Sequence, residues 1–452
     1  MVRYQPWNLF LAIKWTFQEQ DSLAHRRRRA TLNDAHNVLN LVHSMEGAAP
    51  IPNDLGSIAL FVRRIAFQQF WIGSVDGAAV ARQEILFGNL QPNHTFNREF
   101  EAATGLRIAD FIDLTFGLLA VLLGKDSPQA LLKAHFANFG GFNPGAVDTF
   151  LRQLSQSPQE LQTWLNDGES PPIEDQFILP TPLLRAPYLR LGERHFCYFP
   201  PLAYRFVEQF IYRTLRDPDP EKFMRLFGPM FERYVEACLR ESEVKFRTEA
   251  KLQSQLPGVG KCVDFAIDED GGNVLIDAKG VEMSSLGRVT WRAAEVFKAA
   301  KGSAVKAIVQ GMETARRMEQ SSDGDGGKRE HFLLIVTFEP LYLGCGRDLG
   351  ATLGNSLTES LSREFGESLP FPLANVFCLS IREFEDLLEH CRAATSSITN
   401  VLRHARTADA DVKTKRFHFE QHLNEIGGPG LKLPMLSAAL KRIQTRCMGR
   451  ML

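Results

Sequence analysis

Two apolar segments separated by a short polar stretch constrain this chain more than any other part of it. Residues 263–267 and 274–280 have the apolar, β-branched composition that is typical of strands. Residues 268–273 lie between them, are polar and contain two glycines, as do turns that close β-hairpins. The sequence therefore predicts an antiparallel pair of strands here, and this part of the chain must build a sheet.

Three charged residues are embedded in these two segments. Side chains alternate between the two faces of a strand, so Asp277 and Lys279 are predicted to point the same way. Asp264, on the paired strand, is predicted to lie beside them. Carboxylate oxygens bind hard cations, and an amine can orient a water molecule or stabilise developing charge. This set of side chains is what a hydrolytic Mg²⁺ site requires.

The residues Asp277-Ala278-Lys279, preceded by Asp264, resemble the motif of the PD-(D/E)XK nuclease superfamily. Val263 stands where that motif has its proline, which is often missing in the superfamily. The resemblance implies a restriction-endonuclease-like α/β core. It also implies a Mg²⁺ site, in which Mn²⁺ should substitute, with Asp264, Asp277 and the carbonyl of Ala278 as metal ligands and Lys279 as the catalytic lysine.

An amphipathic helix is predicted upstream, over residues 226–239. Phe231, Val235 and Leu239 recur at the spacing of one helical face, and Glu232 lies directly beside that stripe. By the same resemblance, Glu232 is the third acidic residue of the site and a further metal ligand. The alternative is that Glu232 forms an ion pair with a nearby arginine, Arg233 or Arg240, on a solvated face.

The elements that follow have the order of such a core. Residues 244–250 alternate apolar and polar side chains and predict a first strand, ahead of the two strands above. Residues 290–317 predict a long helical region that Gly302 breaks or kinks. Residues 331–338 are almost wholly apolar and predict a buried strand. Together these segments predict the order α-β-β-β-α-β.

Several other patterns have simpler interpretations. The aspartates of residues 321–328 lack the later glutamate of a Ca²⁺ loop, so a solvated loop is expected. Residues 258–261 lack the spacing of a nucleotide-binding loop and predict a turn. His418 and His422 are one helical turn apart with no evident third ligand, and are expected to be surface residues. The basic run at residues 25–29 is either a solvated helix face or a contact for a phosphate backbone.

Composition and the positions of proline-rich and glycine-rich segments divide the chain into four parts. A hairpin predicted over residues 188–198 and the helix after it resemble the lead-in of uncharacterised nuclease-like proteins from bacterial defence regions, a resemblance that covers about residues 180–395. The predicted parts are a mainly helical domain (1–170), a Pro-rich boundary with hairpin and lead-in helix (171–220), a nuclease-like domain (221–395) and a helical tail (396–452).

The overall composition is that of a globular enzyme. The chain has 452 residues, of which 44% are hydrophobic, and a formal net charge of −1, so any nucleic-acid surface must be local. The seven cysteines are scattered without a C-x-x-C pair, which predicts reduced thiols and a cytoplasmic location. No signal peptide and no membrane span are expected.

These patterns lead to one expected function and two alternatives. The expectation is a Mg²⁺-dependent endonuclease that hydrolyses phosphodiester bonds of DNA, as an antiphage or foreign-DNA defence effector with a regulatory or phage-derived protein partner. The alternatives are an RNA-cleaving toxin of the same fold and an inactive nuclease-like protein that binds DNA or acts as a scaffold. Glu249, Glu282 and Lys298 are expected to support the site or contact phosphate.

Overall fold

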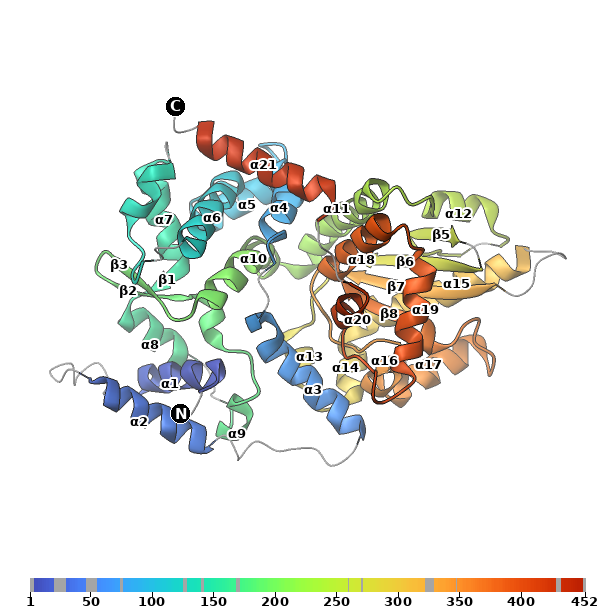
Figure 1. Ribbon diagram of the computed structural model, residues 1–452, viewed down its shortest axis with the longest axis horizontal. Coiled ribbons are helices and arrows are strands. Elements are labelled where there is room, and N and C mark those ends of the chain that lie inside the picture. The colour runs from blue at the N-terminus through green and yellow to red at the C-terminus, as the bar shows by residue number, and fades with distance from the viewer. Residues whose placement is uncertain are drawn as a thin grey trace. The chain divides into compact units, whose positions relative to one another are not determined.

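The chain forms two compact units, coloured along the sequence in Figure 1. Unit 1 comprises Met1–Ile51, Ile65–Asp219 and Ala438–Leu452, and unit 2 comprises Pro52–Arg64 and Pro220–Ser437. Helices α3 (Leu55–Gln69) and α21 (Pro434–Gly449) contribute residues to both units. The computed structural model describes residues 4–19, 30–45, 55–73, 76–124, 128–139, 142–167, 171–258, 260–269, 271–321, 329–346, 348–427 and 432–449.

Unit 1 is mainly helical, as the sequence predicts for the N-terminal region. Its core includes Phe rings, with Phe111 stacked on Phe210 at a centroid distance of 4.7 Å and Phe150 meeting Phe111 edge to face. The other helices of unit 1 are α1 (Pro6–Gln18), α2 (Leu32–Met45), α4 (Ala79–Gln83), α5 (Thr95–Thr104), α6 (Ile108–Leu123), α7 (Pro144–Leu154), α8 (Pro158–Asn166), α9 (Ile173–Gln176) and α10 (Pro200–Arg216).

A small three-stranded sheet completes unit 1. Strands β2 (Tyr188–Leu191) and β3 (Arg194–Cys197) form the predicted hairpin, which turns at Gly192 with a positive φ of 59°. Strand β1 (Ser155–Gln156) pairs with β2 in parallel and was not predicted. A strand of two residues is too short to show an alternating pattern.

One arginine neutralises two buried carboxylates in unit 1. Arg446, on α21, donates from Nη1 to Glu84 at 2.8 Å and from Nε to Asp113 at 2.8 Å. Both carboxylates are fully buried, and the hydrogen bonds to them raise the pKa of Arg446. Two buried anions are costly unless they are paired, so this unit depends on a residue that is distant in sequence from its other parts.

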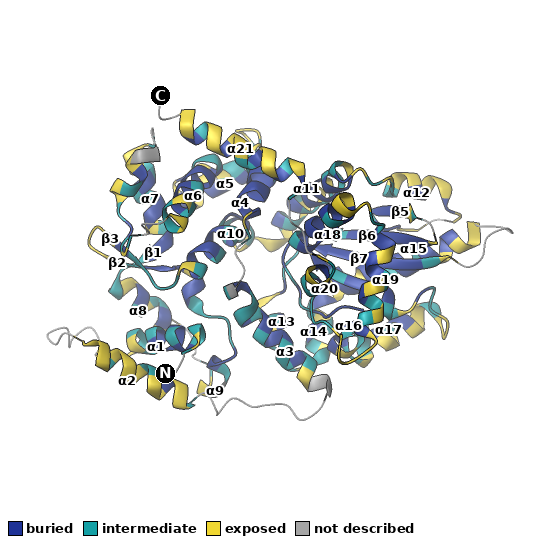
Figure 2. Ribbon diagram, in the orientation of Figure 1, coloured by how far each residue is buried: buried dark blue, intermediate teal, exposed yellow. Residues whose placement is uncertain are grey.

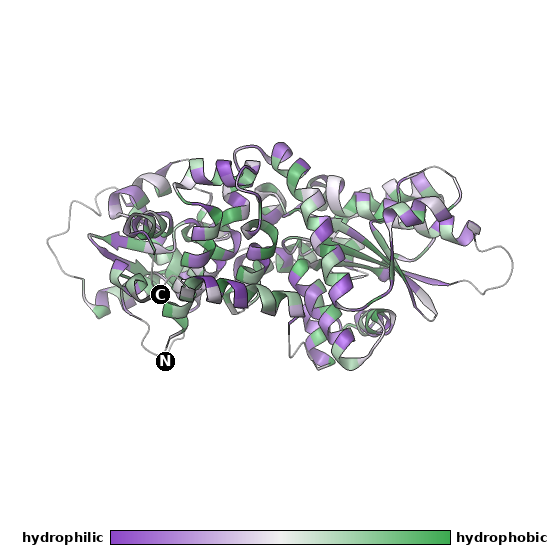
Figure 3. Ribbon diagram, turned by 90° about the horizontal axis from the view of Figure 1, so that it is seen from above, coloured by the Kyte–Doolittle hydropathy of each residue, from purple (hydrophilic) through white to green (hydrophobic). Residues whose placement is uncertain are grey.

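Unit 2 is built on a five-stranded mixed sheet. The strand order is β4 (Phe246–Thr248), β5 (Phe265–Glu269), β6 (Gly272–Lys279), β7 (Glu330–Thr337) and β8 (Val376–Ser380). Strands β4, β5 and β6 are antiparallel neighbours, whereas β6, β7 and β8 run parallel. Strands β6 and β7 are buried almost throughout (Figure 2), and the strands of the sheet are hydrophobic in their central parts and more hydrophilic toward their ends (Figure 3).

Helices cover both faces of this sheet. Helix α15 packs on one face, where a Cβ on its Gly311 would meet Leu333 of β7 at 2.8 Å. Side chains of the opposite face contact other helices: Phe377 meets Phe419 of α20, and Arg406 of α19 lies over Phe332. The helices of unit 2 are α11 (Pro220–Glu241), α12 (Glu249–Gln255), α13 (Ser285–Val289), α14 (Ala293–Ala300), α15 (Lys306–Ser321), α16 (Asp348–Leu353), α17 (Asn355–Phe365), α18 (Ile381–Ala394), α19 (Ile398–Asp409) and α20 (Phe419–Glu425).

Helix α11, strands β4, β5 and β6, helices α14 and α15, and strand β7 follow one another in the order expected from the sequence, but several predicted bounds were wrong. The first strand ends at Thr248, because Glu249 already begins helix α12. The turn between β5 and β6 is tighter than predicted, since Gly271 adopts a φ of 82° and the strands pair up to Glu269 and Gly272. The long helical region predicted from residue 290 begins as α14 at Ala293 and continues as α15, and Gly302 lies in a π-helical turn between them, where the break was predicted.

A segment of α3 packs into unit 2, which the sequence did not predict. The ring of Phe61 stacks on Trp291 at a centroid distance of 6.0 Å, and the guanidinium of Arg64 lies 3.9 Å from the centroid of the same indole. Arg63 donates to the carbonyl of Gly287. The unit therefore takes part of its core from residues that precede α11 by more than a hundred positions.

Other predictions have mixed outcomes. None of the described helices is long and apolar enough to cross a membrane, and all seven cysteines are free thiols. His422 is not a surface residue: it is fully buried, and its Nε2 lies 3.0 Å from Oδ1 of Asp409. The basic run at 25–29 and residues 322–328 of the predicted loop lie outside the described residues.

Candidate active site

The strand register places three carboxylates in one row. Thr248 is paired with Phe265, and Phe265 with Ile276. One further step brings together Glu249, which follows β4, Asp264, which precedes β5, and Asp277, which lies near the end of β6. A hydrogen bond of 2.7 Å from the backbone N of Glu249 to the carbonyl of Asp264 continues this alignment beyond the paired residues. Neighbouring residues on adjacent strands project from the same face of a sheet. The three carboxylates therefore form one acidic row.

Asp264 is tied to the strand that carries the D-x-K residues. Its Oδ2 accepts a hydrogen bond of 2.7 Å from the backbone N of Ala278. That bond orients the carboxylate of Asp264 toward β6. The structure thus brings together two of the predicted metal ligands, Asp264 and Asp277, and the chain between them is only a hairpin.

Asp277 is fully buried and is paired with the lysine two residues along. The Nζ of Lys279 forms an ion pair with Oδ1 of Asp277, and the lysine side chain is 17% exposed. The other oxygen, Oδ2, is buried and has no hydrogen-bond partner among the described residues. A buried carboxylate oxygen without a donor is costly, and binding of a cation is one way to remove that cost.

The electrostatics of the row show an excess of negative charge. Burial, followed by the charge of Asp277, raises the pKa of Asp264 to about 7, against the opposing effects of Lys279 and the Ala278 N–H. Burial also raises the pKa of Asp277, which Lys279 opposes. Groups that resist ionisation because they are buried beside other carboxylates are those that a divalent cation stabilises in the charged form.

Glu232 approaches this row from helix α11. Gly280, directly after Lys279, lets the helix come close, because a Cβ there would meet the ring of Phe227 at 2.9 Å and Phe231 at 3.2 Å. The pKa of Glu232 is raised, first by burial and then by the neighbouring charge of Glu249, and the charges of Lys279 and Asp277 also act on it. The alternative is not observed among the described residues: Glu232 forms no ion pair with Arg233 or Arg240, and Arg240 pairs with Glu236.

The residues present fit a hard divalent cation, although they do not enclose one. Among the described residues, no three His, Cys, Asp or Glu side chains converge closely enough to hold a metal ion. The donor set is nevertheless all carboxylate, which Mg²⁺ and Mn²⁺ prefer, and it contains the unpartnered Oδ2 of Asp277. Asp264 and Asp277 would hold the ion, with Glu232 and the Ala278 carbonyl as further candidates.

The segment that leads into Asp264 is held by a buried arginine that sequence reasoning missed. Arg317, on α15, donates to the carbonyls of Pro257 at 2.8 Å and of Gly258 and Gly260 at 3.2 Å each. One turn earlier on the same helix, Thr314 accepts a 3.1 Å hydrogen bond from the backbone N of Val263. The described residues on either side of position 259, where a turn was predicted, are therefore held on α15, and the strand that follows starts from a defined position.

Three residues expected to support the site have different environments. Glu249 belongs to the acidic row itself. Glu282 is an ion-pair partner of Arg288, at 3.0 Å, and its side chain is buried. Lys298 lies exposed on α14. Lys306, at the start of α15, was not predicted to matter, yet its charge opposes the raised pKa of Asp277.

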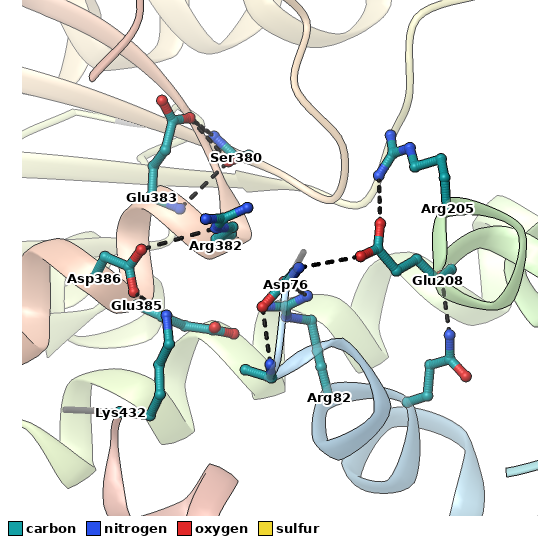
Figure 4. Close-up of polar contacts among 12 residues, drawn as sticks. Asp76, Arg82, Arg205, Glu208, Ser380, Arg382, Glu383, Glu385, Asp386 and Lys432 are labelled. Carbon is teal, nitrogen blue, oxygen red and sulfur yellow. Dashed lines mark hydrogen bonds and ion pairs between the residues drawn. The ribbon is translucent and has the colours of Figure 1, made fainter. Parts of the chain in front are cut away.

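A second group of acidic residues, at the start of α18, has a structural role. Ser380 and Glu383 form a reciprocal capping box. The Ser380 hydroxyl accepts a hydrogen bond from the backbone N of Glu383, and the Glu383 carboxylate accepts one from the backbone N of Ser380. Asp386 forms an ion pair with Lys432 at 2.6 Å and lies 4.0 Å from Arg382, as Figure 4 shows. Because these carboxylates are paired or capped, they lack the unsatisfied charge of the Asp264–Asp277 pair.

No protein-family model, no curated protein and no solved structure matches this chain.

Replacing Arg317 with methionine is expected to loosen the start of β5. The variant loses four hydrogen bonds to residues 257–262, which should lower the free energy of unfolding by roughly 1–3 kcal/mol. Amide hydrogen exchange at residues 260–264 should become faster. Arg316→Met is the matched control, because that neighbour is exposed and contacts Glu313 and the ring of Phe365 rather than residues 257–262. Equal exchange in both variants would show that Arg317 does not position this segment.

The raised pKa of Asp264 predicts how stability depends on pH. The folded state binds this proton more tightly than the unfolded state, so the stabilisation present below about pH 4 is lost as the pH rises through about 7. At pH 8, Asp264→Asn should therefore have a free energy of unfolding at least about 1 kcal/mol higher than that of the wild type, and it should unfold at a higher temperature. Both differences should vanish near pH 4. Adding Mg²⁺ at pH 8 should stabilise only the wild type. A difference that is independent of pH would refute the assignment.

Proposed function

We propose that this protein is a metal-dependent nuclease that hydrolyses phosphodiester bonds of DNA. The observation that carries the proposal is the buried Asp277, which has one oxygen paired with Lys279 and the other without a hydrogen-bond donor, next to the hydrogen-bonded Asp264. The order of helix, three strands, helix and strand around these residues supports a restriction-endonuclease-like core of the PD-(D/E)XK type.

Each residue has a separate task in the proposed reaction. Asp264 and Asp277 would hold a Mg²⁺ ion, and Glu232 would add negative charge beside them. The ion would supply a lowered pKa for a bound water molecule and a positive charge opposite the phosphate. Lys279, whose amine lies on the same face as Asp277, orients the attacking water and stabilises the charge on the phosphate oxygens. Arg317 acts only by holding the segment before Asp264.

A cleavage assay on the purified full chain tests this proposal. Plasmid, linear and single-stranded DNA and tRNA are each incubated with Mg²⁺, Mn²⁺ or EDTA, and cleavage of DNA is expected with either metal but not with EDTA. Cleavage of tRNA alone would establish the RNA-cleaving alternative. Binding of DNA without cleavage under any condition would establish an inactive nuclease-like protein.

Lys279 separates catalysis from metal binding in the same assay. Lys279→Ala should lose cleavage by about 10²–10⁴-fold, in the range for removal of a positioned proton-transfer or charge-stabilising group. It should still be stabilised by Mg²⁺, because the lysine is not a ligand. Lys298→Ala is the control, since that lysine is exposed on α14, and it should cut at close to the wild-type rate. Loss of Mg²⁺ stabilisation in Lys279→Ala would contradict this division of tasks.

We further propose that the nuclease acts in defence against phage or foreign DNA. The net charge of −1 gives no general attraction to nucleic acid, which suits an enzyme that cuts only when it is localised or triggered by a partner. Expression of the wild type in a bacterial host should reduce plaque numbers for part of a phage panel, and a variant lacking the carboxylate of Asp264 should not. Equal plaque numbers for both would remove the defence role and leave the nuclease proposal standing.

A further inference from the structure

A cavity in unit 1 has the lining of a small-molecule site. It lies between helices α1 and α8 and the segment that contains α9, and its volume is about 300 Å³. This is at the lower end of the range for ligand pockets, so a small ligand would fill it. The cavity belongs wholly to unit 1, and none of the carboxylates proposed for catalysis lines it.

A buried amine is among the polar groups that line this cavity. Lys14 is only 9% exposed, and its Nζ donates a 2.8 Å hydrogen bond to Oε1 of Gln176. No described carboxylate forms an ion pair with it, and burial lowers the pKa of its ammonium group. An ammonium has three donors, so an anionic group in the cavity would find both a charge and hydrogen bonds there.

The partner of Lys14 is itself fixed in place. Oε1 of Gln176 also accepts a 2.8 Å hydrogen bond from the indole N–H of Trp15, and Nε2 of Gln176 donates to the carbonyl of Pro171 at 2.8 Å. Both lone pairs of the amide oxygen are therefore in use. The position of the amine is set by a connected polar network rather than by a flexible surface side chain, as binding sites require.

Aromatic rings line the rest of the cavity. Trp7, Phe10 and Trp164 contribute to its wall, and Phe10 is anchored by stacking on Trp71 at a centroid distance of 6.3 Å and an interplanar angle of 12°. Flat π-faces favour flat aromatic ligands, through stacking and the burial of apolar area. Asp167, an exposed residue on the lining, is an acceptor for N–H groups.

We propose that this cavity binds a small molecule consisting of one flat aromatic ring system and one anionic group, of about the size of a nucleoside monophosphate. The anionic group contacts Lys14, and the ring system packs among Trp7, Phe10 and Trp164. Phosphate and carboxylate share this chemistry, and the experiment below distinguishes them. The proposal does not depend on the nuclease activity, since no residue of the candidate active site takes part.

Binding to the purified full chain tests the proposal directly. Isothermal titration calorimetry is performed with AMP, CMP, GMP and UMP, with their uncharged nucleosides, and with indole-3-acetate as an aromatic carboxylate. At least one anionic probe should bind, about tenfold or more tighter than its uncharged counterpart, because a charge-assisted hydrogen bond is lost in the latter. Binding of the nucleotides alone identifies phosphate as the anionic group, and binding of indole-3-acetate alone identifies carboxylate.

Two variants locate the site. Lys14→Met keeps the length of the side chain and should abolish the preference for the anionic probe. Trp164→Ala should weaken the binding of charged and uncharged probes alike. Lys133→Met is the control, because that lysine is exposed in the same unit and pairs with Asp148, and it should bind as the wild type does. Thermal unfolding of each variant shows whether it is folded.

Two results would overturn the proposal. One is the absence of binding by any probe at about 1 mM, a concentration that detects even weak ligands. The other is an anionic probe that binds Lys14→Met as tightly as the wild type while that variant unfolds at the wild-type temperature. If Lys14→Met fails to fold, Trp164→Ala decides the question, and unchanged affinity in it overturns the assignment.

Discussion

Asp277→Asn is expected to reduce nuclease activity by at least about 10³-fold, because it removes a charged ligand whose cation supplies several kcal/mol of charge stabilisation. The substitution preserves shape, and it removes a fully buried charge with an oxygen that lacks a hydrogen-bond donor among the described residues. The thermal stability of the variant should therefore equal or exceed that of the wild type in the absence of metal. Cleavage rates and melting curves of the same preparation are the required measurements.

Asp268→Asn is the matched control for this prediction. Asp268 lies on the same hairpin, in β5, but it is exposed and pairs with Arg247 at 2.7 Å. Its replacement should change neither the rate of cleavage nor the response to Mg²⁺. If Asp277→Asn cuts DNA at the parental rate, the activity arises at another site, and the proposed reaction is wrong.

Arg446→Met is expected to be the most destabilising single substitution among those considered. It leaves Glu84 and Asp113, both fully buried, without the cation that pairs with them. Removing one partner from a buried ion pair costs roughly 3–5 kcal/mol. Chemical denaturation should show this loss, and hydrogen exchange should locate it in α4 to α6 of unit 1 rather than in the sheet of unit 2.

Arg442→Met and a compensated variant complete this experiment. Arg442 lies one turn earlier on α21 and is exposed, so its substitution should change stability by less than about 0.5 kcal/mol. Adding Glu84→Gln and Asp113→Asn to Arg446→Met should recover much of the loss, because buried charges are then absent altogether. If the single and compensated variants are equally unstable, packing of the arginine matters more than its charge.

The central hairpin and the acidic pair could be predicted because their signals are local. Alternation along a strand places Asp277 and Lys279 on one face, and a short polar turn brings Asp264 opposite them. Glu249 was predicted only as a supporting residue, because its place in the row depends on the register between β4 and β5, which local patterns do not show. Arg317 could not be predicted, since it bonds to backbone carbonyls about 60 residues away, which leave no side-chain pattern.

Local patterns also could not predict which segments pack together within each unit. The helical spacing of α3 predicts a buried face, but it does not reveal that Phe61 stacks on Trp291. His422 was expected at the surface because no third metal ligand was evident beside it and His418. Its burial follows from Asp409, whose carboxylate gives the imidazole a partner inside the protein.

The split of unit 1 along the chain has a consequence for how the protein is made. The ribosome releases α1 to α10 long before α21, because residues 220–437 must be translated in between. Domains generally fold as the chain emerges, but until Arg446 appears this one lacks the cation that pairs with both Glu84 and Asp113 in the folded chain. Nascent unit 1 should thus remain a partly open, chaperone-accessible intermediate, and its closure should occur only after unit 2 has been synthesised.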